Sequence, residues 1–365
     1  MDRPPVSRLL STNGEGHDIP AGGAVFPTAI YFANVQIGTP PVDFAVGIDS
    51  GSGDLFIEGK GCDGCTESSL NNQYDPAKSS SSSAQGSFRH SYKTCNFVNP
   101  SASCTISGQE YTEQVSLAGL GPVKLKVGAI QSQSTNFDTK RVVGGLMGLA
   151  GFDGEDPLST LANAGMCDRV WGICMNAAGS VSNGTLTVGG VDETLSDGPI
   201  NYVPDQGLIL PTVEVSSLKL GESTTIPLKR ENSAVLDTGT NVLLLGRTAY
   251  ANVKSSMCAD SSLANCAELW DNQCVQLTDE QVDQYPSLSF QLDGTVLEMS
   301  SRDYLLLRSP LASKADQYCL GIRNGGFTGF IIGDTTMRNY YVVFDKTQSR
   351  IGFGKVNKQT CGGKN

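Results

Sequence analysis

The sequence predicts an all-β protein made of two related lobes, with only a few short helices. Short runs of Val, Ile, Tyr and Thr recur between turns rich in Gly and Ser, while long stretches of helical periodicity are scarce. At 365 residues the chain is longer than the ~250–300 residues beyond which a single hydrophobic core seldom grows. One aspartate-containing pattern also occurs twice, which indicates one copy in each lobe.

The predicted domain boundaries follow from this repeat. The opening MDRPPVSRLLSTNGEG has no hydrophobic signal core, and residues 1–17 are expected to form a flexible leader or the remnant of a prosegment. Residues 18–195 should form the N-terminal lobe and residues 196–365 the C-terminal lobe. No apolar run approaches the ~20 residues of a transmembrane helix, so no membrane span is expected.

The net charge of the chain disfavours two classes of binding partner. Its formal net charge is −11 and its sequence pI is about 4.7. An acidic surface repels phosphate backbones and anionic lipids, so nucleic acid and anionic membranes are not expected as partners. The same charge is compatible with work at low pH, where protonation of carboxylates brings the net charge back toward zero.

The repeated pattern surrounds two aspartates. FAVGIDSGSGDLFI, at residues 44–57, aligns with NSAVLDTGTNVLLL, at residues 232–245, so that Asp49 matches Asp237. A single Asp-Ser/Thr-Gly is weak evidence, because these residues form many turns. Two copies in matching contexts are strong evidence. A charge at the end of an apolar strand is costly to bury, so each aspartate is expected to have a partner.

A second pair of similar segments supports an internal duplication. GGLMGLAG follows the first aspartate and places Gly148 99 residues after Asp49. GFIIGD follows the second and places Gly333 96 residues after Asp237. The nearly equal intervals predict that each lobe carries one Asp loop and one apolar-apolar-Gly segment. The two Asp loops can then meet at the interface between the lobes.

Two carboxyl groups held close together suit general acid–base chemistry. Because they cannot both ionise easily, they hold one shared proton over a broad acidic range. One carboxylate can then take a proton from water while the other donates a hydrogen bond to a carbonyl oxygen. The residues expected to support the pair by hydroxyl groups or close backbone N–H groups are Ser50, Gly51, Ser52, Thr238, Gly239 and Thr240.

Three short helices are predicted between the strands. Asp156 and Pro157 are typical of an N-cap and a first helical residue, and the helix should run to about Met166. A second helix is predicted over residues 247–257. Residues 278–281 read as a capping box for a third helix that stops before Pro286.

The cysteine pattern indicates an oxidising compartment. Eleven cysteines are many for a cytosolic enzyme, although scattered buried thiols remain an alternative. For the first pair a redox or zinc half-site is a weaker alternative to a loop disulfide, since no second such pair and no suitably spaced His follow it. The predicted pairs are Cys62–Cys65, Cys95–Cys104, Cys258–Cys266 and Cys274–Cys319; Cys167, Cys174 and Cys361 are left unplaced.

Other candidate sites have less support. The sequon at Asn183 is compatible with glycosylation. His17 and His90 lie in no motif, so a Ser-His-Asp hydrolase finds no support, and His90 is expected near the surface. No phosphate loop or dinucleotide fingerprint occurs, and no cofactor or metal is expected. Leu146 and Val143 could line a substrate cleft or pack the lobe, and packing is favoured.

From about residue 31 to residue 355 the chain resembles the pepsin-like aspartic endopeptidases. The resemblance rests on the two Asp loops together with YFANVQIGTPP, TLTVGGVDETLSDGPINYVP and GFIIGDTTMRNYYVVFDKTQSRIGFG. It implies a pepsin-like fold of two β-barrel lobes with the active cleft between them. It also implies a water held by Asp49 and Asp237, cleavage between hydrophobic residues of extended polypeptides, inhibition by statine-type compounds and a monomeric enzyme.

The chain departs from the family pattern around the flap over the cleft. Ser50 replaces the usual Thr, and Phe56 stands where a Trp would bond the flap tyrosine. SYKTCNFVNPSASCTISG replaces the usual flap sequence, and Tyr92 is the candidate flap tyrosine. A Cys95–Cys104 disulfide could stiffen the base of an enlarged flap, or it could only close a surface insertion away from the cleft; the sequence leaves both interpretations.

The predicted function is therefore that of an aspartic endopeptidase that acts at acidic pH. The enzyme is expected to be made as a zymogen and to be located in a secreted or lumenal acidic compartment. The alternative is a catalytically silent pepsin-like protein that binds peptides or a protein partner in the same cleft. In that case the two aspartates would only cap their turns.

Overall fold

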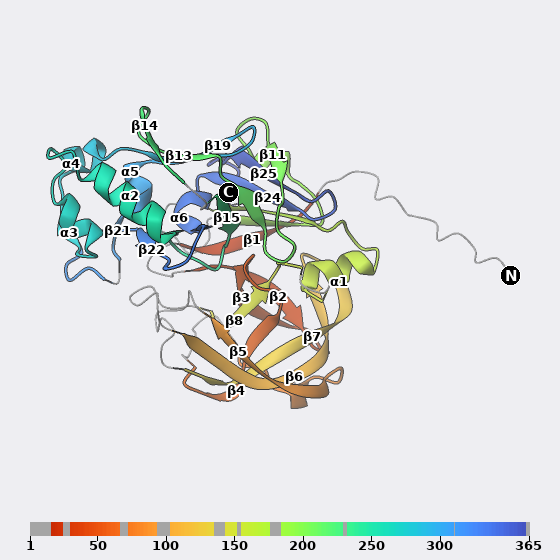
Figure 1. Cartoon of the computed structure of the whole chain (residues 1–365). Helices are drawn as coiled ribbons and strands as arrows, with labels where there is room; N and C mark the ends of the chain where they lie inside the picture. The colour runs from red at the N-terminus through yellow and green to blue at the C-terminus, as the bar shows by residue number, and fades with distance from the viewer. Residues whose placement is uncertain are drawn as a thin grey trace.

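The structure is a computed structural model that describes residues 16–24, 30–65, 72–92, 103–134, 143–151, 155–175, 184–228, 232–309 and 311–362. Strands predominate and form two lobes. The orange and yellow strands of the N-terminal lobe lie below the green and blue elements of the C-terminal lobe in Figure 1. The predicted all-β class is confirmed.

One sheet of thirteen strands contains the N-terminal lobe. In the part of the sheet that forms this lobe, the first two strands are antiparallel to each other, and the third strand is parallel to the second. The spatial order is β2 (Ile30–Ile37), β3 (Val42–Asp49), β8 (Gly145–Gly148), β4 (Leu55–Asp63), β7 (Leu120–Gln133), β6 (Cys104–Leu117) and β5 (Ser83–Tyr92). The short 3-10 helix η1 (Pro76–Lys78) lies between β4 and β5 in the chain.

The rest of this sheet joins the two lobes. It contains β1 (His17–Ala24), β10 (Gly184–Val188), β9 (Val170–Met175), β24 (Tyr340–Asp345), β25 (Arg350–Lys355) and β11 (Asn201–Pro204). The C-terminal strand β24 pairs with β9, so the sheet crosses the boundary predicted at residues 195 and 196. His17 was predicted to end the leader but begins β1, because it pairs with Val188 of β10.

Three smaller sheets build the C-terminal lobe. The first consists of β12 (Thr212–Glu214), β15 (Ser233–Leu236), β23 (Phe330–Ile332), β16 (Leu243–Leu245) and β22 (Ile322–Asn324). The second consists of β14 (Thr224–Ile226), β13 (Ser217–Leu220), β18 (Leu288–Gln291) and β19 (Val296–Met299). The third consists of β17 (Val275–Gln276), β21 (Gln317–Leu320) and β20 (Leu305–Leu307).

The helices match the local signals at their N-termini better than at their C-termini. Asp156 caps α1 (Pro157–Asn163) by accepting from Ser159 N, but the helix ends before the predicted Met166 because Gly165 has φ +74°. α2 (Arg247–Met257) has the predicted bounds, and the predicted capping box opens α4 (Asp279–Gln284). The elements without a prediction are α3 (Cys266–Trp270), α5 (Ser301–Tyr304), α6 (Asp334–Met337) and η3 (Glu193–Leu195).

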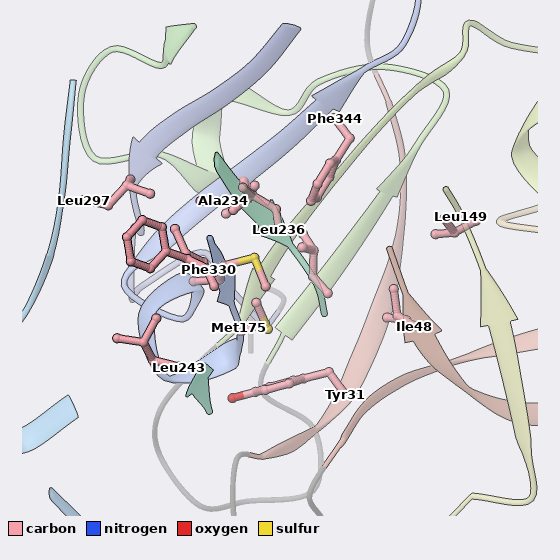
Figure 2. Packing of buried hydrophobic residues seen from close by; sticks show 14 of the residues in the cluster. Tyr31, Ile48, Leu149, Met175, Ala234, Leu236, Leu243, Leu297, Phe330 and Phe344 are labelled. Carbon is pink, nitrogen blue, oxygen red and sulfur yellow. The ribbon is translucent and has the colours of Figure 1, made fainter. Parts of the chain in front are cut away.

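A continuous apolar core underlies the sites of both Asp loops. Ile48 of β3 and Leu236 of β15, the strands that lead into the two aspartates, are both fully buried in it. Figure 2 shows these side chains with Phe330 and Phe344 among the packed residues of both lobes. Burial of this apolar surface holds the ends of the two Asp strands in fixed positions.

Disulfides secure four pairs of described cysteines. Three are predicted pairs, and the fourth joins two residues that the sequence left unplaced. They are Cys62–Cys65, Cys258–Cys266, Cys274–Cys319 and Cys174–Cys361. Cys167 is a free thiol. Cys95 of the remaining predicted pair lies outside the described residues.

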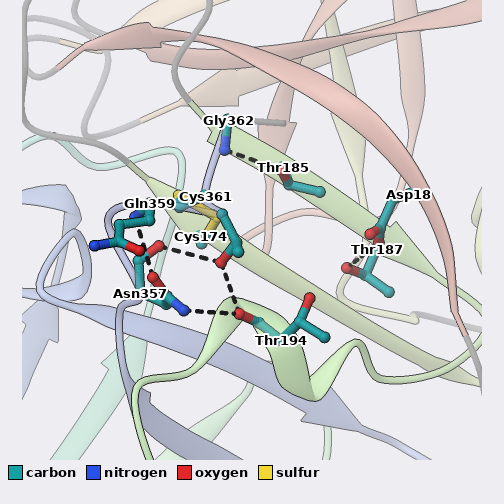
Figure 3. The surroundings of a disulfide bond; sticks show 10 residues. Asp18, Cys174, Thr185, Thr187, Thr194, Asn357, Gln359, Cys361 and Gly362 are labelled. Atoms are coloured by element: carbon teal, nitrogen blue, oxygen red, sulfur yellow. Dashed lines mark hydrogen bonds between the residues drawn. A yellow bond between two sulfur atoms is a disulfide. The ribbon is translucent and has the colours of Figure 1, made fainter. Parts of the chain in front are cut away.

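The bond between Cys174 and Cys361 ties the C-terminal end of the described chain to the sheet that joins the lobes. It spans 187 residues of sequence. Hydrogen bonds surround it, from Gly362 N to Thr185 Oγ1 at 3.2 Å and from Asn357 Nδ2 to Thr194 O at 3.2 Å (Figure 3). The two lobes are therefore linked covalently as well as by shared strands.

Glu58 on β4 supplies a test of pH-dependent stability. It is 7% exposed, and burial raises its pKa to about 7. Because the folded pKa lies above the ordinary value, the stability that Glu58 contributes is fully present below about pH 4 and is lost as the pH rises through about 7. We expect Glu58→Gln to raise the free energy of unfolding at pH 7.5 by about 1–2 kcal/mol, after allowance for solvent screening.

Urea unfolding of wild type and Glu58→Gln at pH 4 and pH 7.5 measures this difference. Glu222 lies exposed in the turn between β13 and β14, so Glu222→Gln makes the same chemical change without burial and should alter neither value. A Glu58→Gln effect of equal size at both pH values would show that Glu58 is not the titrating group.

Candidate active site

The two aspartates occupy equivalent places in the two lobes. Asp49 is the last residue of β3, which pairs in parallel with β8 and places Asp49 beside Gly148. Asp237 directly follows β15, which pairs in parallel with β23. The duplicated sequence pattern is thus a duplicated structural unit, in which the apolar-apolar-Gly segment is the strand beside each Asp loop.

Gly148 and Gly333 are required by the close approach of the Asp loops. A Cβ placed on Gly148 would lie 2.5 Å from Ser52 C, and one on Gly333 would lie 2.1 Å from Thr240 O. Such distances are far below van der Waals contact with backbone atoms. Glycine at these two positions therefore lets each loop pack directly on its neighbouring strand.

The Asp49 carboxylate is held by its own loop. Oδ1 accepts a hydrogen bond from Gly51 N at 2.8 Å, and Oδ2 accepts one from Ser52 Oγ at 2.5 Å. Asp49 is only 5% exposed to solvent. Both oxygens are therefore oriented by donors in the tight turn.

The Asp237 carboxylate has the same pattern of donors. Oδ1 accepts from Gly239 N at 2.8 Å, and Oδ2 accepts from Thr240 Oγ1 at 2.5 Å. Asp237 is 8% exposed. The two sites are thus related by an approximate twofold repetition of chemistry as well as of sequence.

A reciprocal network of four hydrogen bonds joins the two Asp loops. Ser50 N donates to Thr238 Oγ1 at 3.0 Å, and Thr238 N donates to Ser50 Oγ at 2.9 Å. Each hydroxyl then donates to the opposite strand, Ser50 Oγ to Leu236 O at 2.7 Å and Thr238 Oγ1 to Ile48 O at 2.8 Å. Ser50 and Thr238 are fully buried. The loops are therefore locked together across the lobe interface.

Each carboxyl group lies against the glycine of the opposite loop. A Cβ on Gly51 would be 2.7 Å from Asp237 Oδ1, and a Cβ on Gly239 would be 2.6 Å from Asp49 Oδ1. Any larger residue at either position would displace the carboxyl group across from it. The two glycines thus permit the close meeting of Asp49 and Asp237 that the sequence predicted.

The electrostatics of the pair favour a retained proton. Burial, followed by the charge of Asp237, raises the pKa of Asp49 to about 7, while the bonds from Ser52 and Gly51 oppose the rise. The burial of Asp49 and the neighbouring charge of Asp237 therefore both favour the protonated form of Asp49.

Asp334 is a third carboxyl near the pair that the sequence patterns did not single out. It opens α6 directly after Gly333 and is fully buried. Burial, followed by the charge of Asp237, raises its pKa well above the ordinary value. The GFIIGD segment contained this residue, but nothing in the local pattern distinguishes a buried Asp from an exposed helix cap.

The predicted cleft residues lie at different places. Tyr92 ends β5 and packs, partly buried, against a small cluster that includes Phe56 and Phe88. Leu146 packs, also partly buried, against the cluster that contains buried Val143. Leu146 and Val143 therefore contribute to the packing of the lobe, which is the interpretation that the sequence favoured. Asn183 lies outside the described residues.

Two further properties concern the described part of the chain. It contains no helix long and apolar enough to cross a membrane. Within the same residues, no group of three or more His, Cys, Asp or Glu side chains is arranged as a metal site.

Two β lobes that each bring an Asp-Ser/Thr-Gly loop to their junction define the class of aspartic peptidases. The chain matches the family model described as eukaryotic aspartyl protease over residues 30–356, and it belongs to this family. It is accordingly a peptide hydrolase that acts on polypeptides.

The curated relatives are pepsin-like enzymes from distant organisms. The chain is 29% identical over 337 residues to rhizopuspepsin-1 of Rhizopus niveus, covering 89% of this chain and 79% of the relative. It is 25% identical over 346 residues to pepsin A of Sus scrofa, covering 89% and 81%. It is also 25% identical over 393 residues to aspartic proteinase 39 of Arabidopsis thaliana, covering 96% and 79%.

Proposed function

We propose that this enzyme is an endopeptidase that works at acidic pH, with Asp49 and Asp237 as its catalytic residues. The observation that carries the proposal is the reciprocal network of Ser50 and Thr238, which holds two buried, identically liganded carboxyls against each other. A pair of turn-capping aspartates without chemistry would not need this mutual burial, which costs free energy.

The pair would activate water for attack on a peptide carbonyl. One carboxylate accepts a proton from the water as the oxygen adds to the carbonyl carbon, while the protonated partner donates a hydrogen bond to the carbonyl oxygen. Collapse of the tetrahedral intermediate breaks the C–N bond, and the proton held by the pair passes to the leaving amine. The shared proton belongs to the pair and not to either residue.

The expected substrates are extended polypeptides with hydrophobic residues on both sides of the cleaved bond. We further propose inhibition by statine-type compounds and a monomeric enzyme. The four described disulfides support a secreted or lumenal acidic compartment.

A turnover assay separates this proposal from the silent binding alternative. The purified protein is incubated with a denatured protein substrate at pH 3 to 5, with and without a statine-type inhibitor. Inhibitor-sensitive fragments support the endopeptidase. Binding of the inhibitor without any fragments would instead identify a catalytically silent protein that uses the same cleft.

The pH dependence of kcat/KM should be bell-shaped with its maximum in the acidic range. Activity requires one proton on the pair. Burial and the charge of Asp237 raise the pKa of Asp49, so that the pair retains this proton over the acidic range and loses it toward higher pH. At low pH the second carboxyl also becomes protonated and cannot accept a proton from water. Initial rates on a peptide substrate between pH 2 and 8 measure the profile. An optimum above about pH 7 would contradict the proposed mechanism.

A further inference from the structure

The link between β11 and β12 carries two adjacent apolar side chains in solvent. Leu208 is fully exposed, and Ile209 is 55% exposed. Single exposed apolar residues are normal on protein surfaces. The bond from Leu208 to Ile209 is, within the described residues, the one peptide bond with a large exposed apolar side chain on each side. The other large apolar side chains that are exposed in these ranges stand singly in the sequence, and they are Val42, Met166, Val296, Leu307 and Phe327.

The backbone of this link is fixed at its base and unbonded at its tip. At the base, Asp205 Oδ1 accepts hydrogen bonds from Gly207 N at 3.0 Å and from Thr212 N at 2.9 Å. At the tip, Leu208 and Ile209 make no hydrogen bond with any residue in the described ranges. Exposed loop tips are the preferred sites of proteolytic cleavage, because a protease can engage them without first breaking secondary structure.

The strands on either side of the link can be loosened at low cost. β11 is the last strand of the thirteen-stranded sheet, and β12 is the last strand of the five-stranded sheet. Each therefore pairs on one side only, β11 with β25 and β12 with β15. A protease binds its substrate as an extended chain. The link can adopt that form when the ends of two edge strands open, while the inner strands of both sheets stay paired.

We propose that this enzyme cleaves its own chain between Leu208 and Ile209, one molecule acting on another. The inference rests on the proposed function, because both residues meet the proposed preference for hydrophobic residues on the two sides of the cleaved bond. The step consumes one water. The C–N bond between the two residues breaks, Leu208 gains a carboxyl group and Ile209 gains an amino group, so no other reactant is needed.

The attachment of the link favours cleavage by a second molecule. Pro211 O accepts a hydrogen bond from Leu236 N at 2.9 Å, which holds the end of the link beside the strand that leads into Asp237. The other end of the link continues from β11 in the sheet that joins the lobes. An extended substrate must continue on both sides of the catalytic pair, and a short link held at both ends cannot do so in its own molecule. A second molecule meets no such restriction.

The disulfide between Cys174 and Cys361 keeps the two products together. Cleavage produces residues 1–208, which contain Cys174, and residues 209–365, which contain Cys361. Each of the other three described disulfides joins two cysteines on the same side of the cleaved bond. Strand β24 also stays paired with β9, and Ser50 stays bonded to Thr238. The product is therefore a two-chain enzyme with a complete active site.

The test uses the folded Asp49→Asn protein as an inactive substrate for the wild-type enzyme at pH 4. We expect two fragments on a gel with reductant, the smaller of which begins with the sequence ILPTVEV, and a single band without reductant. Cys361→Ser in the substrate chain should release the two fragments without reductant. A parallel sample with a denatured protein measures the turnover of the enzyme independently.

Leu208→Asp in the substrate chain tests the site itself. The position is fully exposed, so the fold should not change, but a charge replaces the apolar side chain next to the cleaved bond. We expect the rate of fragment formation to fall about tenfold or more. Met166→Asp introduces the same charge at a single exposed apolar residue in the turn after α1 and should leave the rate unchanged.

The outcomes separate this inference from the proposed function. Turnover of the denatured protein without any fragment that begins at Ile209 would overturn the self-cleavage and leave the proposed function standing. A wild-type chain that cleaves itself but leaves the Asp49→Asn chain intact would overturn the intermolecular step. Without turnover of the denatured protein, the proposed function fails, and self-cleavage fails with it.

Discussion

Asp49→Asn and Asp237→Asn are each expected to abolish turnover while the protein remains folded. The amide cannot hold the shared proton or accept one from water, so a loss of about 10³-fold or more in kcat is expected. The fold should persist because the amide oxygen can still accept the hydrogen bond from Gly51 N or Gly239 N. The measurements are hydrolysis of a quenched fluorescent peptide at pH 4 and the melting temperature of each variant.

A matched control removes a carboxyl that is not in the pair. Asp293 lies exposed in the turn between β18 and β19, so Asp293→Asn removes the same charge at a distant surface position. It should keep wild-type activity. If either dyad variant retained more than a few per cent of the wild-type rate, the assignment of Asp49 and Asp237 as catalytic residues would be wrong.

Thr238→Val is expected to cause a large loss of stability. Valine is close to threonine in shape but removes the hydroxyl that accepts from Ser50 N and donates to Ile48 O. Two buried backbone groups are then left without partners, and each such group costs about 1–3 kcal/mol, or about 2–6 kcal/mol in total. The free energy of unfolding by urea at pH 4 measures the effect.

Two variants make this result interpretable. Thr238→Ser keeps the hydroxyl and should stay within about 1 kcal/mol of wild type, and it remains informative if the valine variant does not fold. Thr335 is also fully buried, and its hydroxyl has no hydrogen-bond partner within the described part of the chain. Thr335→Val should therefore cost little. Equal losses for Thr238→Val and Thr335→Val would show that the network does not hold the lobes together.

Local signals in the sequence predicted the parts of the fold whose contacts are close in the chain. The capping box at Thr278 opens α4 as expected, since its partners are three residues apart. The short-range pairs Cys62–Cys65 and Cys258–Cys266 formed for the same reason. Helix α1 ended before the predicted Met166 because Gly165 adopts a positive φ. Boundaries of this kind depend on one residue's backbone conformation.

By itself, the sequence determined the two-lobe all-β class and the duplicated Asp loops, because a repeated local pattern needs no knowledge of distant contacts. Only the tertiary structure decided which residues far apart in sequence surround them. It placed β24 beside β9, joined Cys174 to Cys361 and brought His90 to Asp54. Such contacts depend on how strands from both ends of the chain enter one sheet, and hydrophobic periodicity specifies only which face of a strand is buried, not which strand covers it.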